Sequence, residues 1–164
     1  MKKLIISLLL FAAAGTFVLW YLFHDRDKAE ILKNLNSFCE MVNKVPGEAP
    51  AVSALKTARA DRIFAGKIKI VSVSPDRNMT MTAGEFAIQT AMLRKYCERL
   101  YLHYTLDALD INGDDAHGHC TFTLTGKAAG KDEFTEVRLV EAVWQKINGK
   151  WLITSLNIAP VMQK

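Results

Sequence analysis

The sequence lacks the short motifs that identify most nucleotide-binding and catalytic chains. It contains no Gly-rich phosphate loop, no nucleophile elbow and no cysteine–histidine pairing of the catalytic kind. It also lacks a cluster of Lys and Arg interleaved with aromatic residues, the pattern with which a protein follows a phosphate backbone. The net charge of +4 includes Lys2 and Lys3, and residues 25–164 without them carry only +2. We therefore expect no nucleic-acid partner, and no motif indicates a cofactor.

Cysteine is scarce, and the three that are present, Cys39, Cys97 and Cys120, form no pair with metal-ligand spacing. Outside the cytoplasm, an odd number leaves at least one thiol unpaired. Cys39 and Cys97 both fall on expected helices, so a disulfide between them is one interpretation. The favoured interpretation is that the three cysteines are small, buried apolar side chains. His117 and His119 share an expected strand face, but no third ligand accompanies them, so we expect no metal site.

The N-terminus carries a long hydrophobic run, Leu4 to Phe23, whose 20 residues include no charge. As a helix it spans about 30 Å, the thickness of the hydrocarbon core of a bilayer. Lys2 and Lys3 precede it, so the positive-inside rule places the N-terminus in the cytoplasm. We expect a single-pass protein of a bacterial inner membrane, with an anchor over residues 1–24 and a periplasmic domain over 25–164. The alternative is a signal peptide cleaved near residues 12–14, which would leave an exposed apolar N-terminus.

The spacing of apolar residues predicts helices first and strands afterwards. Helices are expected over residues 27–45, 50–64 and 83–98, the last opened by a capping box of Thr82 and Glu85. Residues 67–73 predict a strand whose two lysines, Lys67 and Lys69, suggest a sheet edge, and "SPDRNMT" after it reads as a loop. Four more strands are expected over 101–111, 116–126, 134–147 and 151–159. This order predicts a single α+β domain with an antiparallel sheet.

The last two strands form a hairpin around Asn148 and Gly149, a pair typical of a type I′ turn. In that register Trp144 lies opposite Ile153, and Val140 lies opposite Asn157. One face then carries Val140, Ala142, Trp144, Trp151 and Ile153, and the other carries Leu139, Val143, Ile147, Leu152, Leu156 and Ile158.

Neither face of this hairpin is cleanly polar, although an antiparallel sheet commonly has one wet face. The helices can cover only one of them, and an uncovered aliphatic face usually marks an interface. We therefore expect a homodimer through the sheet, with its contact among Leu139, Val143, Leu152 and Leu156.

The element order, with "DINGDDAHGHCTFTLTG" and "VRLVEAVWQKINGKWLITSLNI", resembles the nuclear transport factor 2-like family over about residues 27–160. The resemblance implies a cone, in which a curved sheet wraps around three helices and Trp144, Trp151 and Ile153 fill or line the interior. It leaves function open, because the family includes ketosteroid isomerase, scytalone dehydratase and polyketide cyclases as well as members that catalyse no reaction.

Candidate pocket residues lie mainly on the strand 101–111, where Tyr101, His103 and Asp107 share one face. His103 and Asp107 are about 13 Å apart along that strand, too far to form a pair, and no residue is assigned a catalytic role. We expect a non-catalytic binding or scaffold domain for a small apolar ligand or a protein partner. The alternative is a lyase or isomerase acting on a hydrophobic substrate in the cone. The complete set of pocket candidates is Tyr96, Tyr101, His103, Asp107, Trp144 and Trp151.

Overall fold

The computed structural model describes residues 26–73 and 76–160. The expected anchor at residues 4–23 lies outside these ranges. Across the described part of the chain, no helix combines the length and the apolar character that a membrane crossing requires.

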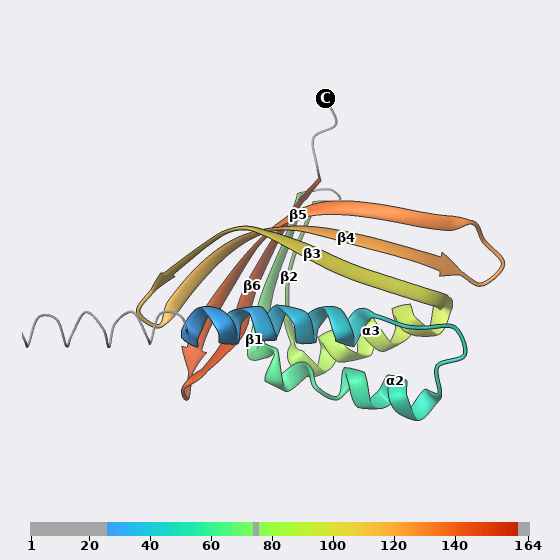
Figure 1. Ribbon diagram of the computed structural model, residues 1–164, viewed down its shortest axis with the longest axis horizontal. Helices are drawn as coiled ribbons and strands as arrows, with labels where there is room; N and C mark the ends of the chain where they lie inside the picture. The colour runs from blue at the N-terminus through green and yellow to red at the C-terminus, as the bar shows by residue number, and fades with distance from the viewer. Residues whose placement is uncertain (1–25, 74–75, 161–164) are drawn as a thin grey trace, which may run out of the picture.

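Within the described residues, three helices and six strands make up the domain (Figure 1). They follow the predicted order except for one additional strand over residues 76–82. The first helix covers residues 26–42. It is followed by α2 (Pro50–Thr57), the short 3-10 helix η1 (Ala60–Arg62), β1 (Phe64–Val73), β2 (Asp76–Thr82), α3 (Ala83–Tyr96), β3 (Cys97–Asn112), β4 (Asp115–Ala128), β5 (Glu133–Ile147) and β6 (Lys150–Pro160).

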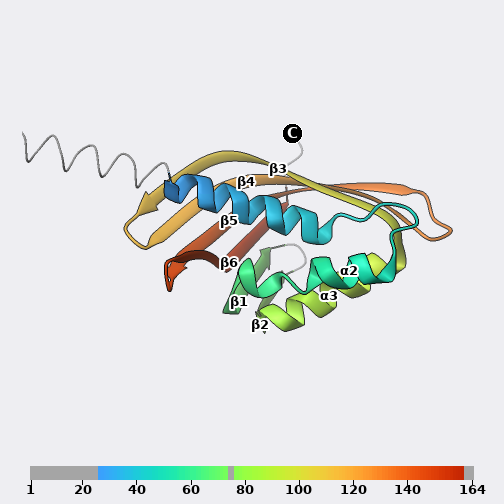
Figure 2. The ribbon, with the colours of Figure 1, turned by 60° about the horizontal axis from the view of Figure 1, so that its bottom comes forward.

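The strands form one six-stranded sheet in the order β2-β1-β6-β5-β4-β3. Neighbouring strands run antiparallel except β1 and β6, which are parallel, so the sheet is mixed rather than wholly antiparallel as expected. Figures 1 and 2 show the sheet curving over the first helix, with α2 and α3 on the same side. The helices thus occupy the concave face, and the α+β cone is confirmed.

The segment expected as a loop is instead the edge strand β2, which pairs with β1 from Lys67↔Thr82 to Val73↔Asp76. Met79 and Met81 are half-buried and alternate with exposed neighbours, a period-two pattern that indicates a strand. The prediction that residues 67–73 form the sheet edge is therefore wrong, because β2 pairs with the outer side of β1 and forms the edge itself. The Thr82 capping box is confirmed, with Thr82 N donating to Glu85 Oε2 at 2.7 Å and Glu85 N donating to Thr82 Oγ1 at 3.2 Å.

The hairpin has the predicted turn, since Asn148 and Gly149 both have positive φ, at 51° and 75°. Trp144 pairs with Ile153 as expected, but the register then shifts between Val143 and Trp144. The extra residue on β6 is Thr154, so Val140 pairs with Ile158 rather than Asn157. A bulge of one residue turns every later side chain to the other face.

One end of the cone is filled by two tryptophans arranged around one buried amide. Trp144 and Trp151 are both buried. Asn34 of the first helix accepts a hydrogen bond from Trp144 Nε1 at 3.2 Å and donates to the carbonyls of Ile63 and Trp151 at 3.0 and 3.1 Å. Because a buried amide needs partners for both of its ends, Asn34 fixes the first helix in one position over the sheet.

A buried arginine joins the three helices at the other end. Arg94 of α3 is only 1% exposed and forms an ion pair with Glu48, in the loop before α2. The last carbonyls of a helix have no partner within that helix, and here the guanidinium supplies one. Its donors reach the carbonyl oxygens of Met41 and Val42 and the hydroxyl of Ser53, each at 3.0 Å, and the carbonyl of Asn43.

Glu48→Gln should therefore destabilise the domain, because it leaves the buried charge of Arg94 without a counter-ion. A loss of about 3–5 kcal/mol is expected in urea unfolding of the full chain in detergent. As a control, Glu133→Gln at the exposed Arg99–Glu133 pair should cost less than about 1 kcal/mol.

The same substitution should change the pH dependence of stability. Burial alone would raise the pKa of Glu48, but the hydrogen bond from Lys56 and the charges of Arg94 and Lys56 hold it below the ordinary value of 4.5. A lowered folded-state pKa stabilises the protein above about pH 4.5, and this contribution is lost as the pH falls below that value. The Glu48→Gln profile should lack this loss, and equal stability of parent and variant at both pH 7 and pH 4 would contradict the assignment.

Candidate functional site

An apolar pocket of about 170 Å³ remains between the first helix and the concave face of the sheet. The strand register places Phe122 opposite Arg138 and Leu124 opposite Glu136, so these four side chains project from the same face. The pocket is lined by Phe38, Leu102, Phe122, Leu124, Glu136, Arg138, Val140, Leu156 and Ile158.

A cluster of phenylalanine rings joins this pocket to the helices, and two of them, Phe38 and Phe122, line it. Phe38 of the first helix packs edge-on against Phe122 of β4 and Phe64 of β1, with ring centroids 5.7 and 5.6 Å away. Phe64 in turn packs against Phe86 of α3 at 4.5 Å. These rings connect the first helix, α3 and the sheet, so the size of the pocket depends on the position of the first helix.

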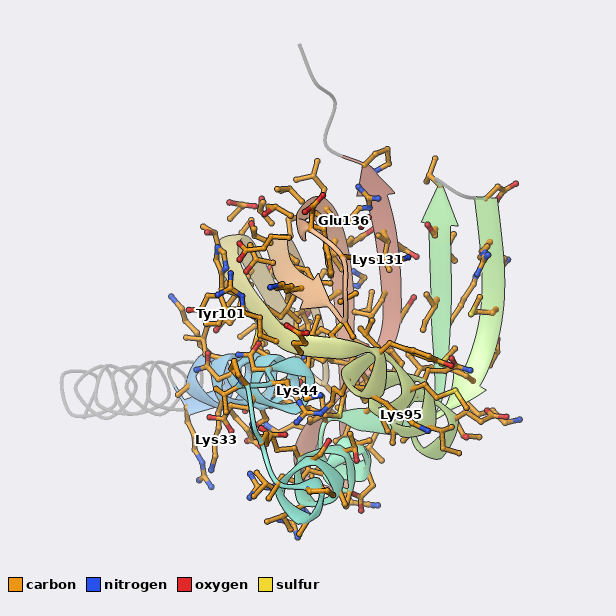
Figure 3. The ribbon with its side chains drawn as sticks, turned by 90° about the vertical axis from the view of Figure 1, so that its right-hand side faces the viewer. Lys33, Lys44, Lys95, Tyr101, Lys131 and Glu136 are labelled. Atoms are coloured by element: carbon orange, nitrogen blue, oxygen red, sulfur yellow. The ribbon has the colours of Figure 1, made fainter. Side chains whose placement is uncertain are left out.

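One charged pair lies at the pocket mouth. Arg138 Nη2 is 3.2 Å from Glu136 Oε2, and Arg138 Nη1 donates to the carbonyl of Val137 at 3.2 Å. Both side chains keep contact with solvent, at 37% exposure for Arg138 and 55% for Glu136. Figure 3 labels Glu136 among the strands, away from the helices that carry Lys33 and Lys95. The pocket thus has apolar walls and one point for polar recognition.

Acid–base groups suited to catalysis do not converge in the pocket within residues 26–73 and 76–160. His103, His117 and His119 are all exposed and lie outside it. Tyr104 is nearby on β3, but its hydroxyl donates to Asn36 Oδ1 at 3.1 Å. Burial raises the pKa of Tyr104, so its hydroxyl is neutral at physiological pH.

The residues predicted for a pocket lie in several separate places. Tyr101 and His103 project to the outer side of β3, where their rings are 5.5 Å apart and line a groove beside the first helix. Asp107 is also exposed and accepts a hydrogen bond from Thr121 Oγ1 at 2.9 Å. Tyr96, at the end of α3, is 72% exposed. Leu100 and Leu102 occupy the concave face of β3, and alternation therefore directs Tyr101 and His103 outward.

Trp144 and Trp151, the other two pocket candidates, belong to the core and do not line this pocket. Trp151 instead borders a separate hollow of about 650 Å³, together with Asn34 and Lys150. Trp151 Nε1 donates to Asp27 Oδ1 at 2.9 Å, and Lys146 bonds the same oxygen at 2.7 Å. The two buried tryptophans fill part of the cone, which is one of the two arrangements expected from the sequence.

The outer sheet face has a hollow of about 330 Å³ between β1 and β4. Glu141 lies in it and accepts a hydrogen bond from Asn157 Nδ2 at 3.1 Å, with His117 Nδ1 3.7 Å away. Of the predicted interface residues, Leu139 is exposed here, and Val143 and Leu152 are half-buried. The prediction of Leu156 as an interface residue is wrong, because the bulge at Thr154 turns its side chain into the core. Only 4% of Leu156 is exposed.

The three cysteines are all free and buried, which confirms that they act as small apolar side chains. Cys39 and Cys97 form no disulfide, and Cys97 begins β3 instead of ending a helix. Burial raises the pKa of Cys39 to about 12 and that of Cys120 to about 11, so both thiols are protonated and unreactive at neutral pH. In the described ranges, no three His, Cys, Asp or Glu side chains are placed to hold a metal ion.

Sequence reasoning did not select the residues that line the pocket. Phe122 and Leu124 belong to a predicted strand, and the alternation in "TFTLT" could have placed them on one face. The sequence pattern did not reveal Glu136 and Arg138 as pocket residues, because the alternating residues Val137 and Leu139 look more like core residues. The charged pair faces inward because its strand neighbours Phe122 and Leu124 do.

No protein-family model and no curated protein matches this chain. Solved structures do match it in fold. A nuclear transport factor 2-like superfamily protein from Salmonella enterica superposes with a TM-score of 0.66 at 14% identity, covering 86% of this chain and 95% of that one. A nuclear transport factor 2-like protein from Novosphingobium aromaticivorans superposes with a TM-score of 0.68 at 12% identity, covering 91% of each chain.

A hexachlorocyclohexane dehydrochlorinase from Novosphingobium barchaimii has the same fold, with a TM-score of 0.63, 13% identity and coverage of 86% of this chain and 90% of that one. The chain therefore has the nuclear transport factor 2-like fold that its sequence motifs predict. At these identities the comparison establishes the fold, and the function has to be argued from the site.

Proposed function

We propose that this chain is a membrane-anchored, extracytoplasmic binding domain, which holds a small apolar molecule in the cone pocket and catalyses no reaction on it. The observation that carries the proposal is the composition of the pocket, whose walls are Phe, Leu, Val and Ile and whose two charged residues, Arg138 and Glu136, form an ion pair with each other. Its volume of about 170 Å³ is close to the roughly 150 Å³ of an apolar cavity that binds benzene. A single ring or a short chain therefore fits.

A lyase or isomerase remains the alternative, and it is favoured by the dehydrochlorinase fold neighbour and by the carboxylate of Glu136 at the pocket mouth. Such chemistry needs a base in a dry pocket, together with a neutral acid or tyrosine that holds the developing oxyanion. Glu136 is instead half-exposed and paired with Arg138, and the hydroxyl of Tyr104 is bonded to Asn36. Both features support binding over catalysis.

Benzyl alcohol should bind in this pocket, which can be measured by methyl NMR of the full chain in non-ionic detergent. Saturable shifts are expected at Leu102, Leu156 and Ile158, because their side chains line the cavity. Leu124→Trp should abolish the shifts by filling the space. The matched control Leu152→Trp, on the outer side of β6, should retain them, and a parent protein without saturable shifts would refute the binding proposal.

The anchor proposal rests on the uncharged run from Leu4 to Phe23 behind Lys2 and Lys3. The protein should stay in the membrane fraction after carbonate washing, and its N-terminal sequence should be intact. Protease added to spheroplasts should digest the domain, because it faces outward. A mature chain that begins near Gly15 would show cleavage of a signal peptide instead.

A homodimer through the outer sheet face is the second part of the proposal. Leu139 is 43% exposed there and Val73 is 66% exposed, and both line the same hollow. Light scattering of the full chain in detergent should give a dimer, and Leu139→Arg should convert it to a monomer by placing a charge in the contact. Ile88→Arg, at an equally exposed apolar position on α3, should leave the dimer intact. A monomeric parent would exclude this interface.

A further inference from the structure

The polar end of the cone pocket is asymmetric, because Arg138 lies deeper than Glu136. Along β5 the inward-facing residues run from Trp144 in the tryptophan-filled end through Val140 to Arg138 and then Glu136. Arg138 lies opposite Phe122, which is buried, whereas Glu136 lies opposite Leu124. A molecule that fills the apolar part of the pocket therefore meets the guanidinium before it meets the carboxylate.

The guanidinium of Arg138 is held in place and still has donors to offer. Its contacts with Glu136 and with the carbonyl of Val137 involve Nη2 and Nη1. An arginine side chain carries five N–H donors in a planar fork. The two contacts found among the described residues therefore leave further donors of Arg138 at the pocket mouth. A planar fork of this kind binds a carboxylate through two parallel hydrogen bonds.

A second positive charge supports an anionic ligand. The register places Ser72 of β1 beside Ile158, and Arg77 of β2 opposite Ser72. Paired residues project from the same face of a sheet, so Arg77 lies on the concave side with the pocket residue Ile158. The two residues are two strands apart, which corresponds to about 10 Å between their backbones. Arg138 and Glu136 balance each other in charge, and Arg77, which does not line the pocket, adds an exposed positive charge on the same side of the sheet.

We propose that the ligand is a small monocarboxylate, which places its ring or short chain against Phe38 and Phe122 and its carboxylate on the guanidinium of Arg138. The ligand carboxylate takes the position that Glu136 holds in the unliganded protein. This assignment rests on the proposed binding function and names the ligand class for the same pocket. The size of the cavity, about 170 Å³, limits the apolar part to about one six-membered ring.

The test compares three ligands of one size, benzoate, benzyl alcohol and benzylamine, by methyl NMR titration of the full chain in non-ionic detergent. Benzoate should bind at least tenfold more tightly than the other two. Arg138→Gln should remove this preference while the affinity for benzyl alcohol stays within about twofold. Glu136→Gln should strengthen benzoate binding, because the competing carboxylate is gone.

Arg99→Gln is the matched control, since Arg99 forms a similar exposed pair with Glu133 on the same sheet and lies outside the pocket. It should keep the preference for benzoate, and an unchanged methyl spectrum should show that each variant is folded. A preference for benzylamine that Glu136→Gln removes would overturn the proposal in favour of a cationic ligand. Equal binding of all three ligands would overturn it and leave the binding function standing, whereas no binding of any would overturn both.

Discussion

The arrangement of the helices on the sheet depends on the buried guanidinium of Arg94. It binds carbonyl oxygens at the end of the first helix and pairs with Glu48, and it reaches α2 through Ser53. Lys44 extends this connection to the sheet, because its ammonium donates to the carbonyls of Arg94 and Cys97 at 2.6 and 2.7 Å. A buried charge is tolerated only where its partners are fixed, so these contacts allow one position for the helices.

The pocket is a consequence of that position. Asn34 holds the first helix against the tryptophan-filled end of the cone, and Arg94 holds its other end. Phe38 lies between these two points and forms one wall of the cavity. Glu136 and Arg138 line the pocket and stay partly exposed, so solvent reaches it at these residues. The nuclear transport factor 2-like fold thus encloses a pocket with apolar walls and one charged pair.

Single-residue features account for most differences between prediction and structure. The turn and the pairs next to it follow from Asn148 and Gly149, but the bulge at Thr154 has no local signal, and it moves Leu156 from the expected outer face into the core. On β3, alternation predicts one face for Tyr101, His103 and Asp107, and all three side chains are exposed. It could not say that this group faces outward, because the pattern of a strand is the same whichever face the helices cover.

The sequence by itself determined the features that depend on neighbouring residues: the helices, the capping box of Thr82 and Glu85, the Asn148–Gly149 turn and the α+β order. Tertiary structure alone decided which face of each strand became the interior. It also brought Arg138, Glu136 and Phe38 from distant segments to one cavity, and it buried Arg94 on a helix whose own apolar pattern is weak. The physical reason is that a strand offers two equivalent faces, and only packing against the helices distinguishes them.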